Sequence, residues 1–385
     1  MRTFDRQRTV QHALAVGVLA AVAMFPSGLV RAVAGQAGPA TAKVAAAGPG
    51  AKSGGVLAGV SCLPSRWCMA VGSSDPAGTK SVAWVWQHGI WRQLDDPPGG
   101  GLTGVSCAAP TFCMATGLRG SSAALLWNGT AWHVMTPAPK HVITAPSCAG
   151  SGLCAVINGT GFLGSGAIAE TWNGHAWKSW KDTSFCDRRP SACGALDISC
   201  ATATMCVAVG FTTMPGGDAL PRAAVWDGKD WHIRNPPRPA RASVTIASAV
   251  SCAGTSCMTI GDATRPEAYV ATYDATTGTW KDISSSAHLP WPADTCGGAC
   301  FRPGTLSCAS STNCMTAGLA GFFAWNGRQF TPAPPVPAGR GSRLSRVSCV
   351  KAFCIAVGYR TIKGVRAPLS ELWNGKTWKI LPQAR

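Results

Sequence analysis

Short apolar segments separated by polar turns recur along most of the chain, and no long stretch places apolar side chains at helical spacing. In each recurrence a Ser-Cys pair is followed by a polar turn, a second cysteine and an apolar run, as in Cys68-Met-Ala-Val-Gly72. Further along, two aromatic residues flank a turn, as in Trp127-Asn-Gly-Thr-Ala-Trp132. Asn-Gly between two apolar runs is typical of a β-hairpin. Each unit therefore predicts four short antiparallel strands.

The unit occurs seven times, and this repetition predicts the architecture. Successive Ser-Cys pairs lie 41 to 56 residues apart, which fits one four-stranded blade of a β-propeller. We therefore predict an all-β fold, a seven-bladed β-propeller with four antiparallel strands per blade. Closing the sheets into a ring also protects strand edges from aggregation. The pairs are Ser61-Cys62, Ser106-Cys107, Ser147-Cys148, Ser199-Cys200, Ser251-Cys252, Ser307-Cys308 and Ser348-Cys349.

The repeat also resembles known propeller repeats. The segment from Tyr273 to Trp280 resembles the turn between the third and fourth strands of kelch-type propellers. The whole unit is similar to repeats in secreted, propeller-like proteins of high-GC bacteria. This resemblance implies the fold and secretion, but it implies no activity. The single glycine and the paired cysteines differ from the kelch pattern.

The N-terminus predicts export. Arg2, Arg6 and Arg8 precede an uncharged apolar run, Ala13–Phe25, which is too short to span a bilayer but suits the core of a signal peptide. Small residues at 32–34 fit a cleavage site. We predict a signal peptide at 1–34, a flexible Ala/Gly/Pro-rich leader at 35–55 and the propeller at 56–385. A retained N-terminal anchor is the alternative, and no later segment has the length of a transmembrane helix.

The 18 cysteines predict disulfide bonds, because their number is even and the chain is expected to be secreted. Seven pairs bracket the turn between the first and second strands. Two further pairs fall in long connections between blades. The spacing does not suit zinc, so we expect no metal and no other cofactor. The predicted pairs are Cys62–Cys68, Cys107–Cys113, Cys148–Cys154, Cys186–Cys193, Cys200–Cys206, Cys252–Cys257, Cys296–Cys300, Cys308–Cys314 and Cys349–Cys354.

The variable connections suggest where a ligand binds. Connections between the second and third strands, and between blades, lie on one face of a propeller and differ here in length. Function on a rigid scaffold normally resides in such loops. Many arginines fall in them, and the chain carries a net charge of +17, which favours an anionic polysaccharide or an acidic protein. The candidate ligand-binding residues are Arg188, Arg189, Arg222, Arg302, Arg343, Arg346, Trp180 and Trp291.

Three functions remain open at this stage. The leading interpretation is a non-catalytic, monomeric binding propeller that is secreted or associated with the cell wall. The second is a carbohydrate-active hydrolase or lyase that uses loop carboxylates, and the third is a structural envelope protein without a discrete ligand. We assign no catalytic residues, and we expect no nucleic-acid partner. The carboxylates considered for the second interpretation are Asp95, Asp96, Asp187, Asp197 and Asp294.

One basic position recurs in the repeat. The residue after the aromatic of the fourth strand is basic in six of the seven units. Strand alternation places it on the solvent side of the outermost strand, where a charge blocks association between sheet edges. We interpret these residues as edge protection rather than as a site. They are Arg92, His133, Lys178, His232, Lys281, Thr331 and Lys379, of which Thr331 is the exception.

Overall fold

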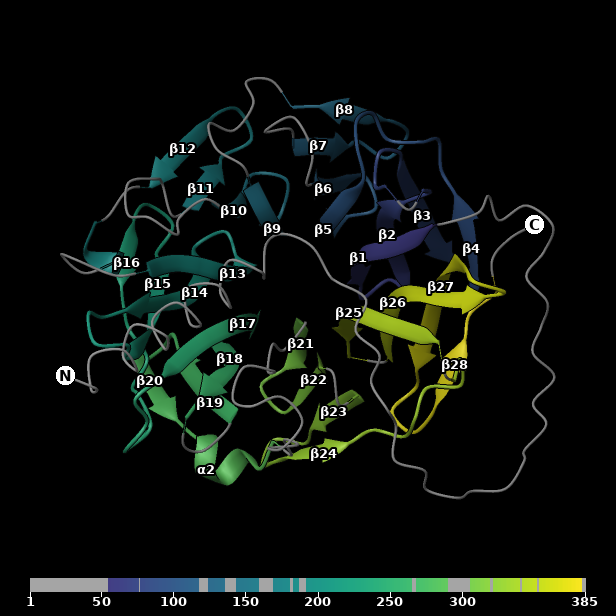
Figure 1. Ribbon diagram of the computed structural model, residues 1–385. Coiled ribbons are helices and arrows are strands. Elements are labelled where there is room, and N and C mark those ends of the chain that lie inside the picture. Colours follow the sequence, from purple (N-terminus) through teal and green to yellow (C-terminus); the bar gives the residue numbers. More distant parts are fainter. Residues whose placement is uncertain are drawn as a thin grey trace, which may run out of the picture. The chain divides into compact units, whose positions relative to one another are not determined.

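A computed structural model describes residues 55–75, 77–117, 124–135, 143–158, 169–180, 183–186, 192–264, 268–289, 305–318, 321–339, 341–351 and 353–382. The predicted signal peptide and nearly all of the predicted leader lie outside these ranges. The described strands form seven four-stranded antiparallel sheets, which are arranged as the blades of a propeller (Figure 1). The predicted all-β, seven-bladed architecture is therefore confirmed.

Each blade is built from consecutive strands, and the first strand of each is innermost. Blade 1 contains β1 (Val56–Leu63), β2 (Trp67–Ser73), β3 (Ser81–Gln87) and β4 (Ile90–Gln93). Blade 2 contains β5 (Leu102–Ala109), β6 (Phe112–Gly117), β7 (Ala124–Trp127) and β8 (Trp132–Val134). Blade 3 contains β9 (Ile143–Cys148), β10 (Cys154–Asn158), β11 (Ala169–Trp172) and β12 (Trp177–Trp180). Blade 4 contains β13 (Ala192–Thr202), β14 (Met205–Thr213), β15 (Ala219–Trp226) and β16 (Trp231–Ile233).

The remaining three blades follow the same order. Blade 5 contains β17 (Thr245–Ala253), β18 (Ser256–Ala263), β19 (Ala268–Asp274) and β20 (Thr279–Asp282). Blade 6 contains β21 (Thr305–Ser310), β22 (Asn313–Gly318), β23 (Gly321–Trp325) and β24 (Phe330–Pro332). Blade 7 contains β25 (Ser342–Val350), β26 (Phe353–Ile362), β27 (Val365–Trp373) and β28 (Trp378–Ile380). Two short helices, η2 (Thr183–Cys186) and α2 (Ser284–Ala287), lie in the connections after blades 3 and 5.

The disulfides join neighbouring strands within a blade. In all seven blades the two cysteines face each other in the register of the first and second strands, as Cys62 and Cys68 do. An eighth disulfide, Cys186–Cys193, joins η2 to β13. These eight predicted pairs are confirmed, and Cys296 and Cys300 lie outside the described residues. Closing so short a loop contributes about 2 kcal/mol to stability in the chain-entropy model.

The glycine that ends the apolar run of the second strand faces a β-bulge in the first strand. In blade 1 the pairing register shifts between Leu57 and Gly59. A Cβ atom on Gly72 would lie 1.9 Å from the carbonyl oxygen of Val56, so no larger residue fits without moving the backbone. The equivalent Gly210, Gly261 and Gly358 meet the corresponding oxygens at 1.8–2.0 Å. The bulge therefore explains this glycine of the repeat.

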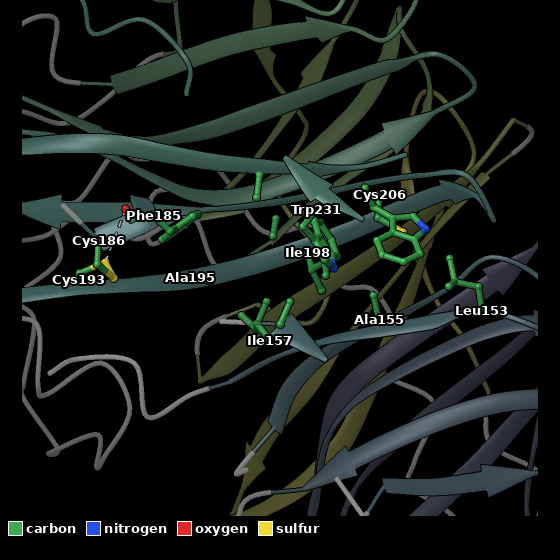
Figure 2. Packing of buried hydrophobic residues seen from close by; sticks show 14 residues of the cluster. Leu153, Ala155, Ile157, Phe185, Cys186, Cys193, Ala195, Ile198, Cys206 and Trp231 are labelled. Atoms are coloured by element: carbon green, nitrogen blue, oxygen red, sulfur yellow. Dashed lines mark hydrogen bonds between the residues drawn. A yellow bond between two sulfur atoms is a disulfide. The ribbon is translucent and has the colours of Figure 1, made fainter. Parts of the chain in front are cut away.

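The hydrophobic core consists of clusters that lie between adjacent blades. Figure 2 shows one of them, in which Ile157 of blade 3 and Ile198 and Trp231 of blade 4 belong to a single buried cluster. Phe185 of η2 and the Cys186–Cys193 disulfide extend this cluster outward. Because each cluster needs both neighbours, blades are stabilised mainly by the blades beside them.

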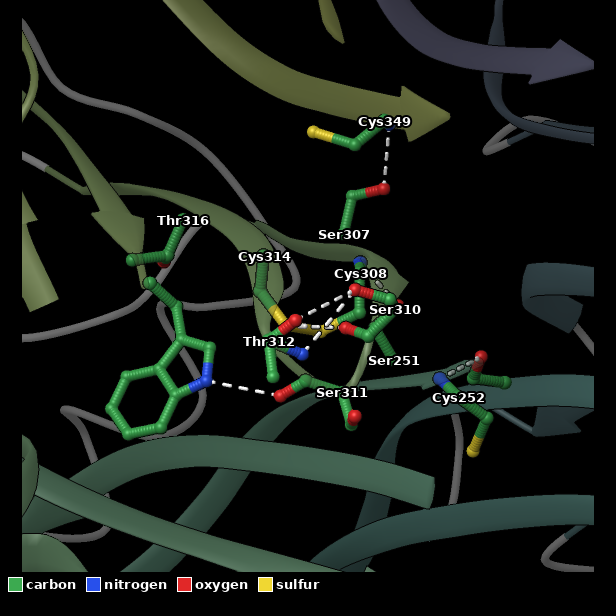
Figure 3. The surroundings of a disulfide bond; sticks show 12 residues. Ser251, Cys252, Ser307, Cys308, Ser310, Ser311, Thr312, Cys314, Thr316 and Cys349 are labelled. Carbon is green, nitrogen blue, oxygen red and sulfur yellow. Dashed lines mark hydrogen bonds between the residues drawn. A yellow bond between two sulfur atoms is a disulfide. The ribbon is translucent and has the colours of Figure 1, made fainter. Parts of the chain in front are cut away.

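The Ser-Cys pair links each blade to the next. The innermost strands pair on one side only, so their free edges carry backbone N–H groups that need acceptors. At every seam the N–H of the cysteine donates to the serine Oγ of the preceding blade, over 2.8–2.9 Å. Figure 3 shows two of these bonds, Cys308 N to Ser251 Oγ and Cys349 N to Ser307 Oγ. The seven bonds form a closed belt around the axis.

The ring closes without exchanging a strand. Blades 1 and 7 share no strand, because each takes its four strands from one end of the described chain. The seam between them has the same components as the others. Cys62 N donates to Ser348 Oγ at 2.9 Å, and the ring centroids of Trp86 and Phe353 lie 5.3 Å apart. Among the described residues, non-covalent contacts alone hold this seam.

A carboxylate is buried inside blade 7. Glu371 lies on β27, and its side chain is 0% exposed. Its Oε1 accepts a hydrogen bond from the backbone N–H of Ala338 at 3.2 Å, whereas Oε2 has no hydrogen-bond partner among the described residues. Burial raises the pKa of Glu371 from 4.5 to about 7, and the bond from Ala338 opposes this change.

Candidate functional site

A groove of about 960 Å³ lies between blades 5 and 6, at the perimeter of the propeller. We call it the perimeter groove. Its wall on blade 5 contains Thr272, Lys281, Ile283, Ser286 and His288, from β19, β20 and the segment around α2. Its wall on blade 6 includes Thr312, Trp325, Asn326, Arg328 and Gln329, from the end of β23 and the two turns of that blade. The segment around α2 and the neighbouring strand β24 are visible at the lower edge of Figure 1.

The seams differ in the third residue after the aromatic of the fourth strand. In blade 3 the third residue after the aromatic of the fourth strand is Trp180, whose ring packs 6.2 Å from Phe185 and 5.9 Å from Trp231. The equivalent residue in blade 5 is Ile283, which lines the groove. Both residues are partly buried against the core cluster of their own seam.

The chemistry of the perimeter groove is cationic and rich in hydrogen-bonding groups. Lys281 and Arg328 contribute the positive charges, and both are exposed. Hydroxyl groups of Ser and Thr residues and the amides of Asn326 and Gln329 surround them. No Asp or Glu is among the described residues that line the groove. Such a surface suits an anionic ligand that also carries hydroxyl groups.

Local structure holds the blade 6 wall rigidly. The Oδ1 of Asn326 accepts hydrogen bonds from the backbone N–H groups of Arg328 and Gln329, both at 2.9 Å, which fixes the turn. The indole N–H of Trp325 donates to the carbonyl of Ser311 at 3.1 Å. Positive φ at Gly327 (90°) completes the turn. The groups that face the groove are thus held in place before a ligand arrives.

The arginines predicted to bind a ligand on the loop face are placed differently by the structure. Arg222, which the sequence analysis assigned to a connection, lies on β15 and is only 8% exposed, and burial lowers its pKa. Arg343 and Arg346 were also assigned to a connection, but they lie on β25, the innermost strand of blade 7. None of the three lines the perimeter groove. Arg188, Arg189 and Arg302 lie outside the described residues.

Two tryptophans were also predicted to bind the ligand, and the structure describes one of them. Trp180 is half-buried and packs against the core cluster between blades 3 and 4. It therefore contributes packing at that seam, and it is not among the residues that line the perimeter groove. Trp291 lies outside the described residues.

The carboxylates considered for a hydrolase lie in separate places. Asp95 and Asp96 are exposed after β4, whereas Asp197 is on the innermost strand β13. The Oδ2 of Asp197 accepts a hydrogen bond from Val250 N at 2.9 Å. Burial raises the pKa of Asp197 to about 6, and this bond and the charge of Arg346 oppose the change. Asp187 and Asp294 lie outside the described residues.

Among the described residues, no group of three or more His, Cys, Asp or Glu side chains is arranged to hold a metal ion. Neither helix in the described part of the chain has the length and apolar composition needed to cross a lipid bilayer. The density of disulfides is typical of proteins from an oxidising compartment.

Comparison with known proteins supports the fold. No protein-family model matches the chain, and no curated protein matches it. Among solved structures, the β-propeller domain of the Trilobed protease from Pyrococcus furiosus is 8% identical, with a TM-score of 0.53 over 85% of this chain and 95% of that domain. YCF48 from Cyanidioschyzon merolae is 13% identical, with a TM-score of 0.50 over 82% of this chain and 95% of its own. At these identities the similarity establishes the β-propeller fold alone, and the resemblance of the repeat to secreted bacterial proteins stays a prediction.

The sequence analysis did not predict the perimeter groove. It interpreted Lys281 as edge protection, and it placed the ligand on the opposite face from the turns that carry Arg328. The groove combines residues of two blades, and no pattern within one repeat marks them.

Proposed function

We propose that this chain is a secreted, non-catalytic binding propeller that holds an anionic glycan of the cell envelope in the perimeter groove. The observation that carries the proposal is the lining of that groove, which combines Lys281 and Arg328 with hydroxyls and amides and contains no described carboxylate. The volume of about 960 Å³ is within the range of sites that bind small molecules or short segments of a polymer.

The rigidity of the scaffold supports binding rather than catalysis. The seams are fixed by the disulfides, by the seven bonds between cysteine N–H and serine Oγ, and by turns with side-chain hydrogen bonds. Binding a ligand therefore costs little free energy for ordering the protein. The disulfides also suit an extracellular location. The described carboxylates provide no pair within the groove that could act as acid and base on a glycosidic bond.

The first experiment measures affinity for polygalacturonate, with neutral dextran as the comparison polymer. We expect polygalacturonate to bind and dextran not to bind. Binding should weaken when salt is raised from 0.1 M to 1 M, because the screening length falls from about 10 Å to about 3 Å. Equal binding of both polymers would contradict an electrostatic site.

The repeat supplies a matched control for the groove. The double variant Lys281→Ala/Arg328→Ala removes both cations of the groove, and we expect it to lose affinity about tenfold or more. Lys379 and Lys376 occupy the same two repeat positions in blade 7 and do not line the groove. Lys379→Ala/Lys376→Ala should therefore retain affinity. Equal loss in both double variants would mean that binding depends on diffuse charge and not on this site.

A further inference from the structure

The seam between blades 3 and 4 contains an internal counterpart of the perimeter groove. Lys178 follows the aromatic of β12 as Lys281 follows that of β20. The Nζ of Lys178 donates to Oδ1 of Asp230, at 2.7 Å, and to the carbonyl of Lys229, at 3.2 Å. Asp230 belongs to the turn of the next blade, where blade 6 has Gln329. At that seam, the lysine forms an ion pair with a carboxylate of the protein itself.

The turns at the two seams are built in the same way. Asp227 Oδ1 accepts from the N–H groups of Lys229 and Asp230, at 2.8 and 2.9 Å, as Asn326 does in blade 6. The third-strand indoles of Trp226 and Trp325 both donate to a carbonyl of the preceding turn at 3.1 Å. Asp230 and Gln329 therefore end turns of the same construction, and Gln329 lines the groove together with Lys281, the lysine of the previous blade.

The seams differ in the charge of that last side chain. Gln329 is neutral, and no ion-pair partner of Lys281 is found among the described residues. We propose that the perimeter groove binds the carboxylate of a uronic acid residue, which takes beside Lys281 the position that the carboxylate of Asp230 takes beside Lys178. This inference rests on the proposed function and names the chemical class of its ligand.

The other groups of the groove favour a sugar acid over an acidic peptide. Thr272, Ser286 and Thr312 offer hydroxyl groups to the hydroxyls of a sugar. The ammonium group of Lys281 matches one carboxylate, and Arg328 adds a second positive charge to the same groove. The geometry thus points to a glycan with a carboxylate on its sugar ring.

A variant that places a carboxylate in the groove tests the inference directly. In Gln329→Asp, the new carboxylate should form an ion pair with Lys281, as Asp230 does with Lys178. This variant should therefore bind polygalacturonate at least about tenfold more weakly. Gln329→Asn, which is neutral, should keep the affinity within about threefold of the wild type. Thermal unfolding of both variants checks that the fold is intact. Retained affinity in Gln329→Asp would overturn the inference.

The polymers test the ligand class directly. Polygalacturonate whose carboxylates have been reduced to alcohols should bind at least about tenfold more weakly than the parent polymer. Equal binding of the reduced polymer, or tighter binding of dextran sulfate or polyglutamate, would overturn the assignment to a uronic acid.

A small probe separates this inference from the proposed function. Sodium glucuronate should shift the side-chain NMR signal of Lys281 in lysine-labelled protein and leave that of Lys379 unchanged. If glucuronate shifts Lys281 but no polysaccharide binds, the carboxylate site stands and the glycan-binding function fails. If neither lysine responds, or both respond equally, the carboxylate site is refuted.

Discussion

Replacing the buried Glu371 with glutamine should change how the stability of the propeller depends on pH. Folding raises the pKa of this carboxyl from 4.5 to about 7, because its side chain is removed from water and Oε2 has no hydrogen-bond partner among the described residues. The folded protein therefore binds the proton more tightly than the unfolded chain. The corresponding stability is fully present below pH 4.5 and is lost as pH rises through 7.

The size of the effect follows from the change in pKa. Each pKa unit corresponds to about 1.4 kcal/mol, so the free energy of unfolding should fall by about 3 kcal/mol between pH 4.5 and pH 7 through this group. Glu371→Gln is neutral at every pH and keeps an oxygen for the N–H of Ala338. We expect it to be as stable as the wild type near pH 5 and more stable by about 2–3 kcal/mol at pH 8.

Urea unfolding followed by tryptophan fluorescence at pH 5, 6, 7 and 8 measures this difference. Asp274→Asn is the control, because the side-chain hydroxyl and the backbone N–H of Thr276 hold the pKa of Asp274 below its usual range. The difference in free energy of unfolding between this control and the wild type should stay constant from pH 5 to pH 8. A difference between wild type and Glu371→Gln that does not change with pH would refute the reasoning.

Three further predictions concern the repeat. Ser348→Ala, which removes the acceptor at the closing seam, and Ser106→Ala, which removes the one between blades 2 and 3, should each lower the free energy of unfolding by about 1–3 kcal/mol in urea; a much larger loss for only one would show that the seams are not equivalent. Gly210→Ala should lower the melting temperature strongly because of the bulge, whereas Gly152→Ala, whose Cβ would meet nothing within 4 Å, should leave it nearly unchanged; equal effects would contradict the role of the bulge. Trp180→Ala should cost at most about 3 kcal/mol, since the ring is half-buried, and leave affinity for polygalacturonate unchanged, and a loss of affinity would restore Trp180 as a ligand residue.

The repeat was sufficient to predict the blades, the order of strands and the cysteine pairs, because each depends on residues close together in the chain. The connections were harder. Arg343 and Arg346 were assigned to a loop because the bulge at this point of β25 breaks the two-residue alternation of a strand. Arg222 was assigned to a loop because glycines and a proline precede it, although β15 begins at Ala219.

The candidate site depends on contacts between blades, which the sequence of one repeat does not contain. Whether Lys281 is available depends on a residue of blade 6 that lines the same groove, Gln329. Such pairs lie tens of residues apart, and no local pattern marks them. Comparing the same repeat position at two seams identifies them once the seams are known.

The locality of the disulfides has a consequence for how the molecule comes apart. Every described disulfide joins cysteines five to seven residues apart in sequence. The described disulfides therefore close only short, separate loops within the chain. Packing and hydrogen bonds alone hold the described blades together as a ring. Pulling on the two ends of the propeller would peel blades away one after another, and each released blade would keep its own small loop closed. The cross-links protect individual hairpins, while the integrity of the whole depends on the seams.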